Sequence, residues 1–312
     1  MHSSDIGKAL TVFALLSMNS PVLLGQSTEY IAPRTEYGHP NLNGVWQALN
    51  TANYDLQGHE ARPAMALLPI PPSSASPGTD RATPGALPAE ELRALGAVGG
   101  VPAGQGVVVG NEIPYQPWAA ARQIENAENW LMRDPEIKCF LPGVPRATYM
   151  PYPFQIIQGA SQILIAYEFA GATRTIHMED VGSSPSPTWM GWSVGSWEGD
   201  TLVVDVTGFN GQTWFDRSGN FHSEALHVVE RYTPISPDHL MYEATIEDAN
   251  VFTEPWQIRM PLYRRIEPDK QLLEYECVEF VEQLMYGELG LNNPATGQQN
   301  DCLLYTSPSQ RD

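Results

Sequence analysis

The chain has 312 residues, and its 36 acidic and 17 basic side chains give a net charge of −19. An acidic surface repels nucleic acid and anionic lipid, so we expect neither a nucleic acid nor a membrane as a partner, and solubility alone accounts for the charge. The length suits a single domain, or a single domain with an appendage.

Both ends of the chain are expected to lie outside the fold. Met1–Gly25 places Lys8 before a short apolar run, a pattern that is typical of a secretory signal peptide and too short to span a membrane. Cys302–Asp312 reads CLLYTSPSQRD and looks like a translated sequencing adapter. We therefore expect a periplasmic or extracellular protein whose single domain occupies residues 26–301.

The first part of this domain is expected to combine one strand with an extension. Asn41–Ala48 predicts a strand that follows a turn. Pro63–Gly110 is rich in Pro, Gly and Ala and lacks hydrophobic periodicity. We expect it to form a Pro/Gly-rich extension or insertion that reaches about residue 135, with one short helix over 88–96. A second helix is predicted over Pro117–Met132.

From residue 154 onward, strand-like runs alternate with short turns. Successive strands joined in this way predict an antiparallel meander, and so many strands favour closure into a β-barrel, which leaves no exposed edge. A helix-like tail is expected over 281–289. The predicted strands are Phe154–Gln158, Gln162–Phe169, Thr173–Glu179, Met190–Trp197, Thr201–Phe209, Ala225–Thr233, Leu240–Glu247, Trp256–Arg264 and Gln271–Phe280.

Two resemblances bear on this fold. The triplet Gly44-Val45-Trp46, with the meander and the terminal helix, resembles a lipocalin-like (calycin) β-barrel, although the long Pro63–Gly110 segment departs from that compact pattern. The strings PGVPRATYMPYPFQI, WEGDTLVVDVTGFN, TWFDRSGNFHSEALHVVERYT and IEDANVFTEPW are similar to a family of secreted bacterial proteins without an assigned activity. That likeness covers most of the chain and implies secretion and a single domain.

Strand alternation selects the side chains that face the barrel interior. In Ala225–Thr233 the more apolar face carries Glu230, and in Thr173–Glu179 it carries Arg174. The neighbouring strands place Tyr167 and Tyr242 on the same side. We therefore expect Glu230 and Arg174 to be the main charges in an aromatic and aliphatic cavity.

These two charges allow different chemistry. Alone, a buried Glu230 would have a raised pKa and would suit a general acid or base. Paired with Arg174, it would form a structural ion pair, or Arg174 would bind the carboxylate of a ligand. The residues alone leave these alternatives open.

The turn before the glutamate strand, Asp216–Glu224, is expected at the barrel mouth, with Trp214 as a ligand contact beside it. Its Asp and Gly residues fit ordinary turn chemistry, whereas His222 could lean over the opening and move protons. His222 and His227 lie on opposite faces of a regular strand, so we expect no metal site.

The cysteines Cys139 and Cys277 form no C-x-x-C motif, which argues against a zinc site built on thiolates. They could form a disulfide in an oxidising compartment or remain as buried thiols.

The sequence thus favours a secreted β-barrel that binds a small, partly apolar molecule, with or without a carboxylate, through Tyr167, Arg174, Trp214, Glu230 and Tyr242. The alternative is a metal-independent hydrolase, lyase or isomerase, with Glu230 or His222 as acid or base and Arg174 stabilising negative charge. A third reading is a structural or interaction module. We expect no cofactor, and the sequence does not predict the oligomeric state.

Overall fold

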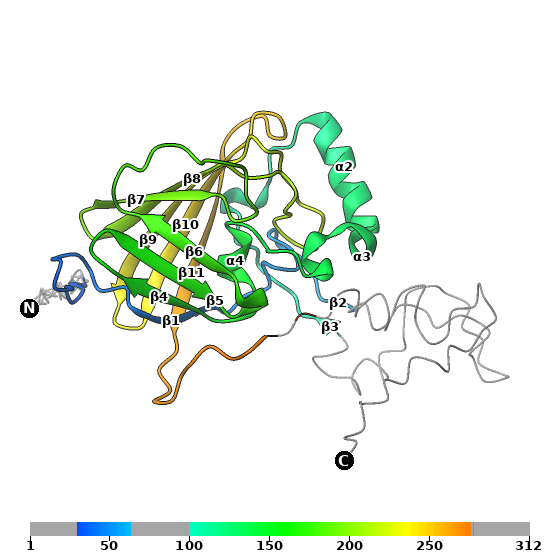
Figure 1. Cartoon of the computed structure of the whole chain (residues 1–312). Helices are drawn as coiled ribbons and strands as arrows, with labels where there is room; N and C mark the ends of the chain where they lie inside the picture. Colours follow the sequence, from blue (N-terminus) through cyan, green and yellow to red (C-terminus); the bar gives the residue numbers. More distant parts are fainter. Residues whose placement is uncertain (1–29, 64–99, 276, 278–312) are drawn as a thin grey trace, which may run out of the picture.

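A computed structural model describes residues 30–63, 100–275 and 277 (Figure 1). The expected signal peptide, the short helix over 88–96, the helical tail over 281–289 and the adapter-like end lie outside the described residues. The described elements in chain order are β1 Gly44–Ala48, β2 Arg62–Pro63, β3 Gly100–Val101, η4 Val109–Asn111, α2 Pro117–Glu128, α3 Trp130–Arg133, η5 Pro135–Lys138, α4 Arg146–Tyr149, β4 Phe154–Gln158, β5 Gln162–Tyr167, η6 Phe169–Gly171, β6 Thr173–His177, β7 Trp192–Glu198, β8 Thr201–Thr207, β9 His227–Ser236, β10 His239–Glu247 and β11 Trp256–Arg264.

The fold is mainly β, and its centre is a closed barrel, as the sequence predicts. The strand order around the barrel is β1-β11-β10-β9-β8-β7-β6-β5-β4, and β1 closes it by pairing with both β11 and β4. The chain therefore runs mostly as an up-and-down meander, and the barrel strands lie side by side in Figure 1. Closure leaves no barrel strand with a free edge.

One pair of neighbours departs from the antiparallel pattern. β6 and β7 are parallel, with the register Ile176↔Ser193 and His177↔Val194. Residues 178–191 carry the chain back along the barrel between them. A parallel connection of this kind needs a crossover of a dozen or more residues, whereas the antiparallel pairs need only tight turns.

Side chains at alternating strand positions face the barrel interior, as predicted, but they fill it as a packed core where we expected a cavity. Val228, Glu230 and Tyr232 are fully buried, while the intervening Val229 and Arg231 are only partly buried. A single apolar core extends through the barrel and includes residues from most of its strands, among them Trp46, Phe154, Ile165, Val204, Tyr242 and Leu262.

The Gly44-Val45-Trp46 triplet owes its glycine to a close approach. A Cβ on Gly44 would lie 2.2 Å from Nη1 of Arg264. That guanidinium donates to the Asn43 carbonyl and stacks over the Trp46 ring, 4.1 Å from its centroid. A side chain at the start of β1 would therefore displace this guanidinium from its packing.

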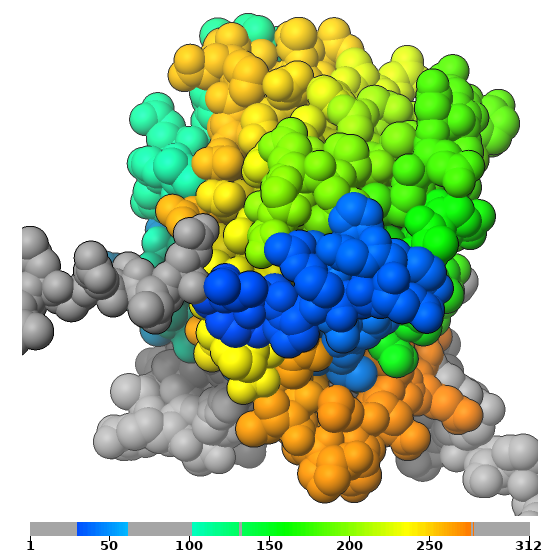
Figure 2. All heavy atoms as spheres, turned by 90° about the vertical axis from the view of Figure 1, so that its left-hand side faces the viewer, coloured from blue at the N-terminus to red at the C-terminus, as the bar shows by residue number. Residues whose placement is uncertain are grey.

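The segment before β1 lies against the barrel wall. Arg34 forms an ion pair with Asp200 in the β7–β8 turn, and the His39 ring stacks on Trp197 of β7. Figure 2 shows this segment in blue beside the green strands.

The predicted helix over Pro117–Met132 is present as α2 and α3, with a break at Asn129. Its contact face is not the apolar one, because Trp118 and Ile124 are exposed while Ala119 and Asn126 are buried. The buried face meets the turn before β9, where Gly219 permits close packing: a Cβ there would lie 2.5 Å from the Ala127 backbone nitrogen.

The strand predicted over Gln271–Phe280 is wrong for 271–275, which form no strand, and most of the remainder lies outside the described residues. The physical reason is closure, since β1 already occupies the edge of β11. The segment after β11 instead lies outside the barrel. The Leu273 backbone N–H donates to Glu168, and the Tyr275 ring packs against Tyr152.

Candidate functional site

Four of the predicted site residues are buried inside the barrel, namely Tyr167, Arg174, Glu230 and Tyr242. Arg174 of β6 and Glu230 of β9 form a buried ion pair. The other oxygen of Glu230 accepts hydrogen bonds from the hydroxyls of Tyr232 (3.0 Å) and Tyr242 (2.8 Å), and Arg174 Nε donates to Ser193 Oγ (2.8 Å). Strand alternation therefore predicts the burial of these two charges correctly, and they bind one another.

The electrostatics of this network hold the ion pair together. Burial lowers the pKa of Arg174, but the Glu230 carboxylate raises it further, so the net pKa lies well above its ordinary value. Burial and the same carboxylate raise the pKa values of Tyr232 and Tyr242 well above their usual range. Arg174 is thus charged, both tyrosines are neutral donors, and each Glu230 oxygen has a partner.

A separate hollow of about 950 Å³ lies between α2 and the loop that joins β8 to β9. One wall is a single face of α2, formed by Trp118, Ala121, Arg122 and Glu125, which follow helical spacing. The other parts of the lining are Asn126, Arg133, Lys138, Gly211, Trp214, Phe221 and His222. Two predicted site residues, Trp214 and His222, therefore belong to this hollow and not to the Arg174–Glu230 network.

The loop wall is shaped by a buried aspartate. Asp216 accepts hydrogen bonds from the backbone N–H groups of Leu56 (2.9 Å), Ser218 (2.9 Å) and Asn220 (3.2 Å). This closes the turn, so that Trp214 and Phe221 pair across an isolated bridge. Burial raises the Asp216 pKa to about 7. The turn reading of this segment fits these contacts.

The lining of the hollow has an excess of positive charge, with three cations and one carboxylate. Glu125 accepts from Arg133 (2.7 Å) and from Arg122 (3.2 Å). Nη1 of Arg133 is buried without a hydrogen-bond partner, and Lys138 forms no ion pair with any residue in the described part of the chain. In a protein with a net charge of −19, this is a local positive site.

His222 is buried at the inner side of the hollow and is neutral at pH 7. Its Nε2 lies 2.6 Å from Thr213 Oγ1, and its Nδ1 lies 2.8 Å from the Ser223 carbonyl oxygen. Its ring packs against Phe209 and Phe215. Burial lowers its pKa to about 4. Both ring nitrogens have protein partners, and none of these is shared with Glu230.

We expect His222 to make the protein less stable in mild acid. Its pKa falls from 6.5 to about 4 on folding, so between these values the unfolded chain binds a proton that the folded chain does not. The free energy of unfolding should therefore decrease by about 3 kcal/mol from this residue as the pH falls from 7 to 4. Denaturant titrations of the wild type and His222→Gln at both pH values measure the difference.

The control for this experiment is His227→Gln, because burial lowers the His227 pKa but Asp205 and Glu247 raise it further, and the net pKa is raised. A raised pKa stabilises the folded state at low pH, so this variant should lose stability in acid relative to the wild type. An equal pH dependence of the wild type and His222→Gln would contradict the buried, neutral His222.

The histidines do not converge on one point. His227 lies on the outside of the barrel between Asp205 (2.8 Å) and Glu247 (3.1 Å), and His177 packs against Trp192. Over 30–63, 100–275 and 277, no group of three His, Cys, Asp or Glu side chains is placed to hold a metal ion.

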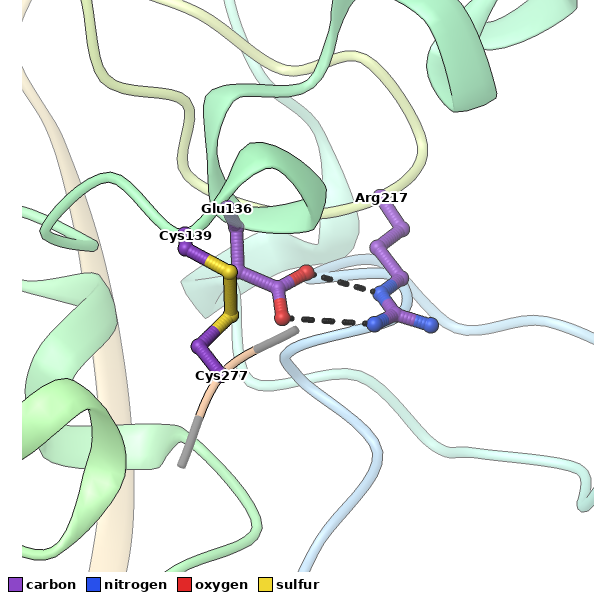
Figure 3. The surroundings of a disulfide bond; sticks show 4 residues. All are labelled: Glu136, Cys139, Arg217 and Cys277. Carbon is purple, nitrogen blue, oxygen red and sulfur yellow. Dashed lines mark hydrogen bonds and ion pairs between the residues drawn. A yellow bond between two sulfur atoms is a disulfide. The ribbon is translucent and has the colours of Figure 1, made fainter. Parts of the chain in front are cut away.

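A buried charge network at the end of the barrel was not predicted. Arg146 of α4 donates to both oxygens of Asp134 (2.8 and 2.9 Å) and to Asn53 (2.9 Å), and it also contacts Glu136. Glu136 in turn binds Arg217 (3.0 Å; Figure 3). The sequence signal for this network is that Asp134 and Glu136 lie only twelve and ten residues before Arg146.

Cys139 and Cys277 form a disulfide beside this network, with their Cα atoms 5.6 Å apart (Figure 3). The bond joins the segment after β11 to the end of η5. Because Lys138 of η5 lines the hollow, the disulfide and the Glu136–Arg217 pair hold one corner of the hollow in place.

No protein-family model matches the chain, and no curated protein matches it either. Among the described helices, none has the length and apolar character needed to cross a bilayer.

Proposed function

We propose that the protein binds a small anion with a flat apolar part, such as an aromatic carboxylate, in the hollow between α2 and the β8–β9 loop. Three aromatic side chains, Trp118, Trp214 and Phe221, offer apolar surface to the flat part. Arg133 and Lys138 offer charge to the anion.

The observation that carries this proposal is the unbalanced positive charge in the hollow. Lys138 forms no ion pair with any residue in the described part of the chain. Arg122 and Arg133 share one carboxylate, that of Glu125. An anion beside Lys138 and Arg133 would balance this charge through charge-assisted hydrogen bonds.

The hollow suits this ligand better than the barrel interior does. Arg174 already binds the carboxylate of Glu230, and the interior is occupied by the side chains of the core. The hollow is open to solvent and large enough for a small aromatic molecule. The predicted class of ligand is therefore retained, and its site lies in the hollow at Trp214 and His222 and not inside the barrel.

Binding of 2-naphthoate, with 2-naphthalenemethanol as a neutral molecule of similar shape, tests this function. We expect the acid to bind at least about tenfold more tightly than the alcohol, because only the acid places a negative charge beside Arg133 and Lys138. Lys138→Gln should weaken binding of the acid about fivefold and leave the affinity for the alcohol unchanged. Quenching of tryptophan fluorescence measures the affinity for each ligand.

Lys270→Gln is the matched control, since Lys270 is exposed on the segment after β11 and is not part of the lining. It changes the net charge by the same amount and should leave naphthoate binding unchanged. Equal affinities for the acid and the alcohol, or equal effects of the two lysine variants, would overturn the proposal.

Secretion to the periplasm or the cell exterior is part of the proposal. It is supported by the signal-like N-terminus and by the disulfide, because disulfides persist mainly in oxidising compartments.

The catalytic alternative stays a prediction. It would need Glu230 or His222 to exchange protons with a substrate, and the partners of both groups are already within the protein.

A further inference from the structure

The wall that α2 contributes to the hollow places an aromatic ring close to a cation. Trp118 lies in the first turn of the helix, Arg122 follows four positions later and Glu125 three positions after that, all on one face. A ring that packs on Trp118 therefore has a guanidinium about one helical turn away, or about 5.4 Å along the axis. The side chains of Arg122 and Glu125 are 53% and 46% exposed, so a ligand in the hollow can reach them.

The positive charge of the hollow exceeds what one anionic group can balance. The lining contains Arg122, Arg133 and Lys138 but only one carboxylate, that of Glu125. The hydrogen bond and the charge of Arg133, together with Arg122, lower the pKa of Glu125, so this carboxylate is charged at neutral pH. The surplus is therefore two positive charges, and a ligand with a single carboxylate leaves one of them unbalanced.

The cations of the lining occupy two positions. Glu125 contacts Arg133 at 2.7 Å and Arg122 at 3.2 Å, whereas Lys138 is not within ion-pair distance of it. Arg122 belongs to α2 and Lys138 to η5, and between them the chain passes through the break at Asn129 and through α3. One anionic group beside Lys138 and Arg133 therefore leaves Arg122 to bind another.

We propose that the ligand of the hollow carries two anionic groups at opposite ends of a flat aromatic core, as an aromatic dicarboxylate does. This inference rests on the proposed function and specifies its ligand. The core packs among the three aromatic side chains, one carboxylate binds Lys138 and Arg133, and the other binds Arg122. The hollow of about 950 Å³ has room for such a ligand, since sites for drug-sized molecules measure about 300–1,000 Å³.

The net charge of −19 does not exclude a ligand with two negative charges. At physiological ionic strength, exposed charges more than about 8 Å apart are largely screened from one another. The cations in contact with the ligand therefore act on it more strongly than the distant carboxylates of the protein surface.

Binding of 2,6-naphthalenedicarboxylate, compared with 2-naphthoate, tests this inference. The diacid should bind about tenfold more tightly, with about twofold from its two equivalent carboxylates and about fivefold from the contact with Arg122. The 2,3-isomer has the same charge with both carboxylates at one end of the rings, and it should bind at least about threefold more weakly than the 2,6-isomer. Quenching of tryptophan fluorescence measures each affinity.

Arg122→Gln assigns the second contact. This variant should lower the preference for the 2,6-diacid over 2-naphthoate from about tenfold to about twofold. Arg259→Gln is the matched control, because Arg259 of β11 is also exposed (58%) and paired with a glutamate, Glu243, but is not part of the lining. It should retain the wild-type preference.

The outcomes separate this inference from the function on which it rests. If 2-naphthoate binds and the 2,6-diacid binds at most about twofold more tightly, the two-anion ligand is wrong and the proposed function stands. Equal affinities for the two isomers, or the same preference in Arg122→Gln and Arg259→Gln, would also overturn the inference. If neither 2-naphthoate nor the diacids bind, the proposed function itself fails.

Discussion

Replacing Glu230 by Gln is expected to lower the free energy of unfolding by about 3–5 kcal/mol. Glu230 and Arg174 are both buried, and an amide in place of the carboxylate leaves the guanidinium without a countercharge. The amide also offers only one acceptor oxygen, whereas Glu230 accepts from Arg174, Tyr232 and Tyr242 through two. Urea titration followed by tryptophan fluorescence measures the loss.

Glu198→Gln is the matched control for this variant. Glu198 binds Arg231 at 2.8 Å on the outside of the barrel, and its side chain is 59% exposed. The change in net charge is the same, but the expected loss is below about 1 kcal/mol, because solvent screens exposed pairs. Similar losses for the two variants would show that the buried pair contributes no more than a surface pair.

Removing the disulfide is the second large expected effect. Cys139 and Cys277 are 138 positions apart, and the loop-entropy model predicts that Cys139→Ser/Cys277→Ser lowers the free energy of unfolding by about 5 kcal/mol. The bond constrains the unfolded chain across every barrel strand from β4 to β11. Urea titrations with and without reductant measure the effect.

Reductant provides the internal control for this prediction. It should reduce the stability of the wild type to that of the double variant and leave the double variant unchanged. If reductant, at concentrations that break the bond, leaves the wild type as stable as before, the disulfide does not stabilise the fold.

The barrel could be predicted from the sequence because its signals are local. Alternation of apolar residues with period two fixes which side chains are buried, and this alone placed Arg174 and Glu230 inside. The parallel β6–β7 pair could not be predicted in the same way, because the sequence of residues 178–191 does not indicate which strand β7 pairs with. The strand expected over 271–275 failed for a related reason: its local pattern contains no information about the edge that β1 already fills.

The candidate site could be predicted only in part. Trp214 and His222, predicted at the barrel mouth, line one hollow, and the other wall of that hollow comes from α2, about a hundred residues earlier. The exposed face of α2 carries Trp118 and Arg122 because Gly219 and Asn126 determine which side of the helix packs. That orientation depends on tertiary contacts, which helical spacing does not specify.

The parallel pairing of β6 with β7 divides the barrel wall into two sets of consecutive strands, β4–β6 and β7–β11. β1 joins these sets on one side, and only two registered residue pairs join them on the other. Arg174 crosses this second junction from within, since it binds Ser193 on β7 and Glu230 on β9. The buried Arg174 thus links the two sets of strands where the backbone ladder is shortest. At the β6–β7 junction, where the backbone ladder has the fewest residue pairs, side-chain contacts therefore contribute to keeping the barrel closed.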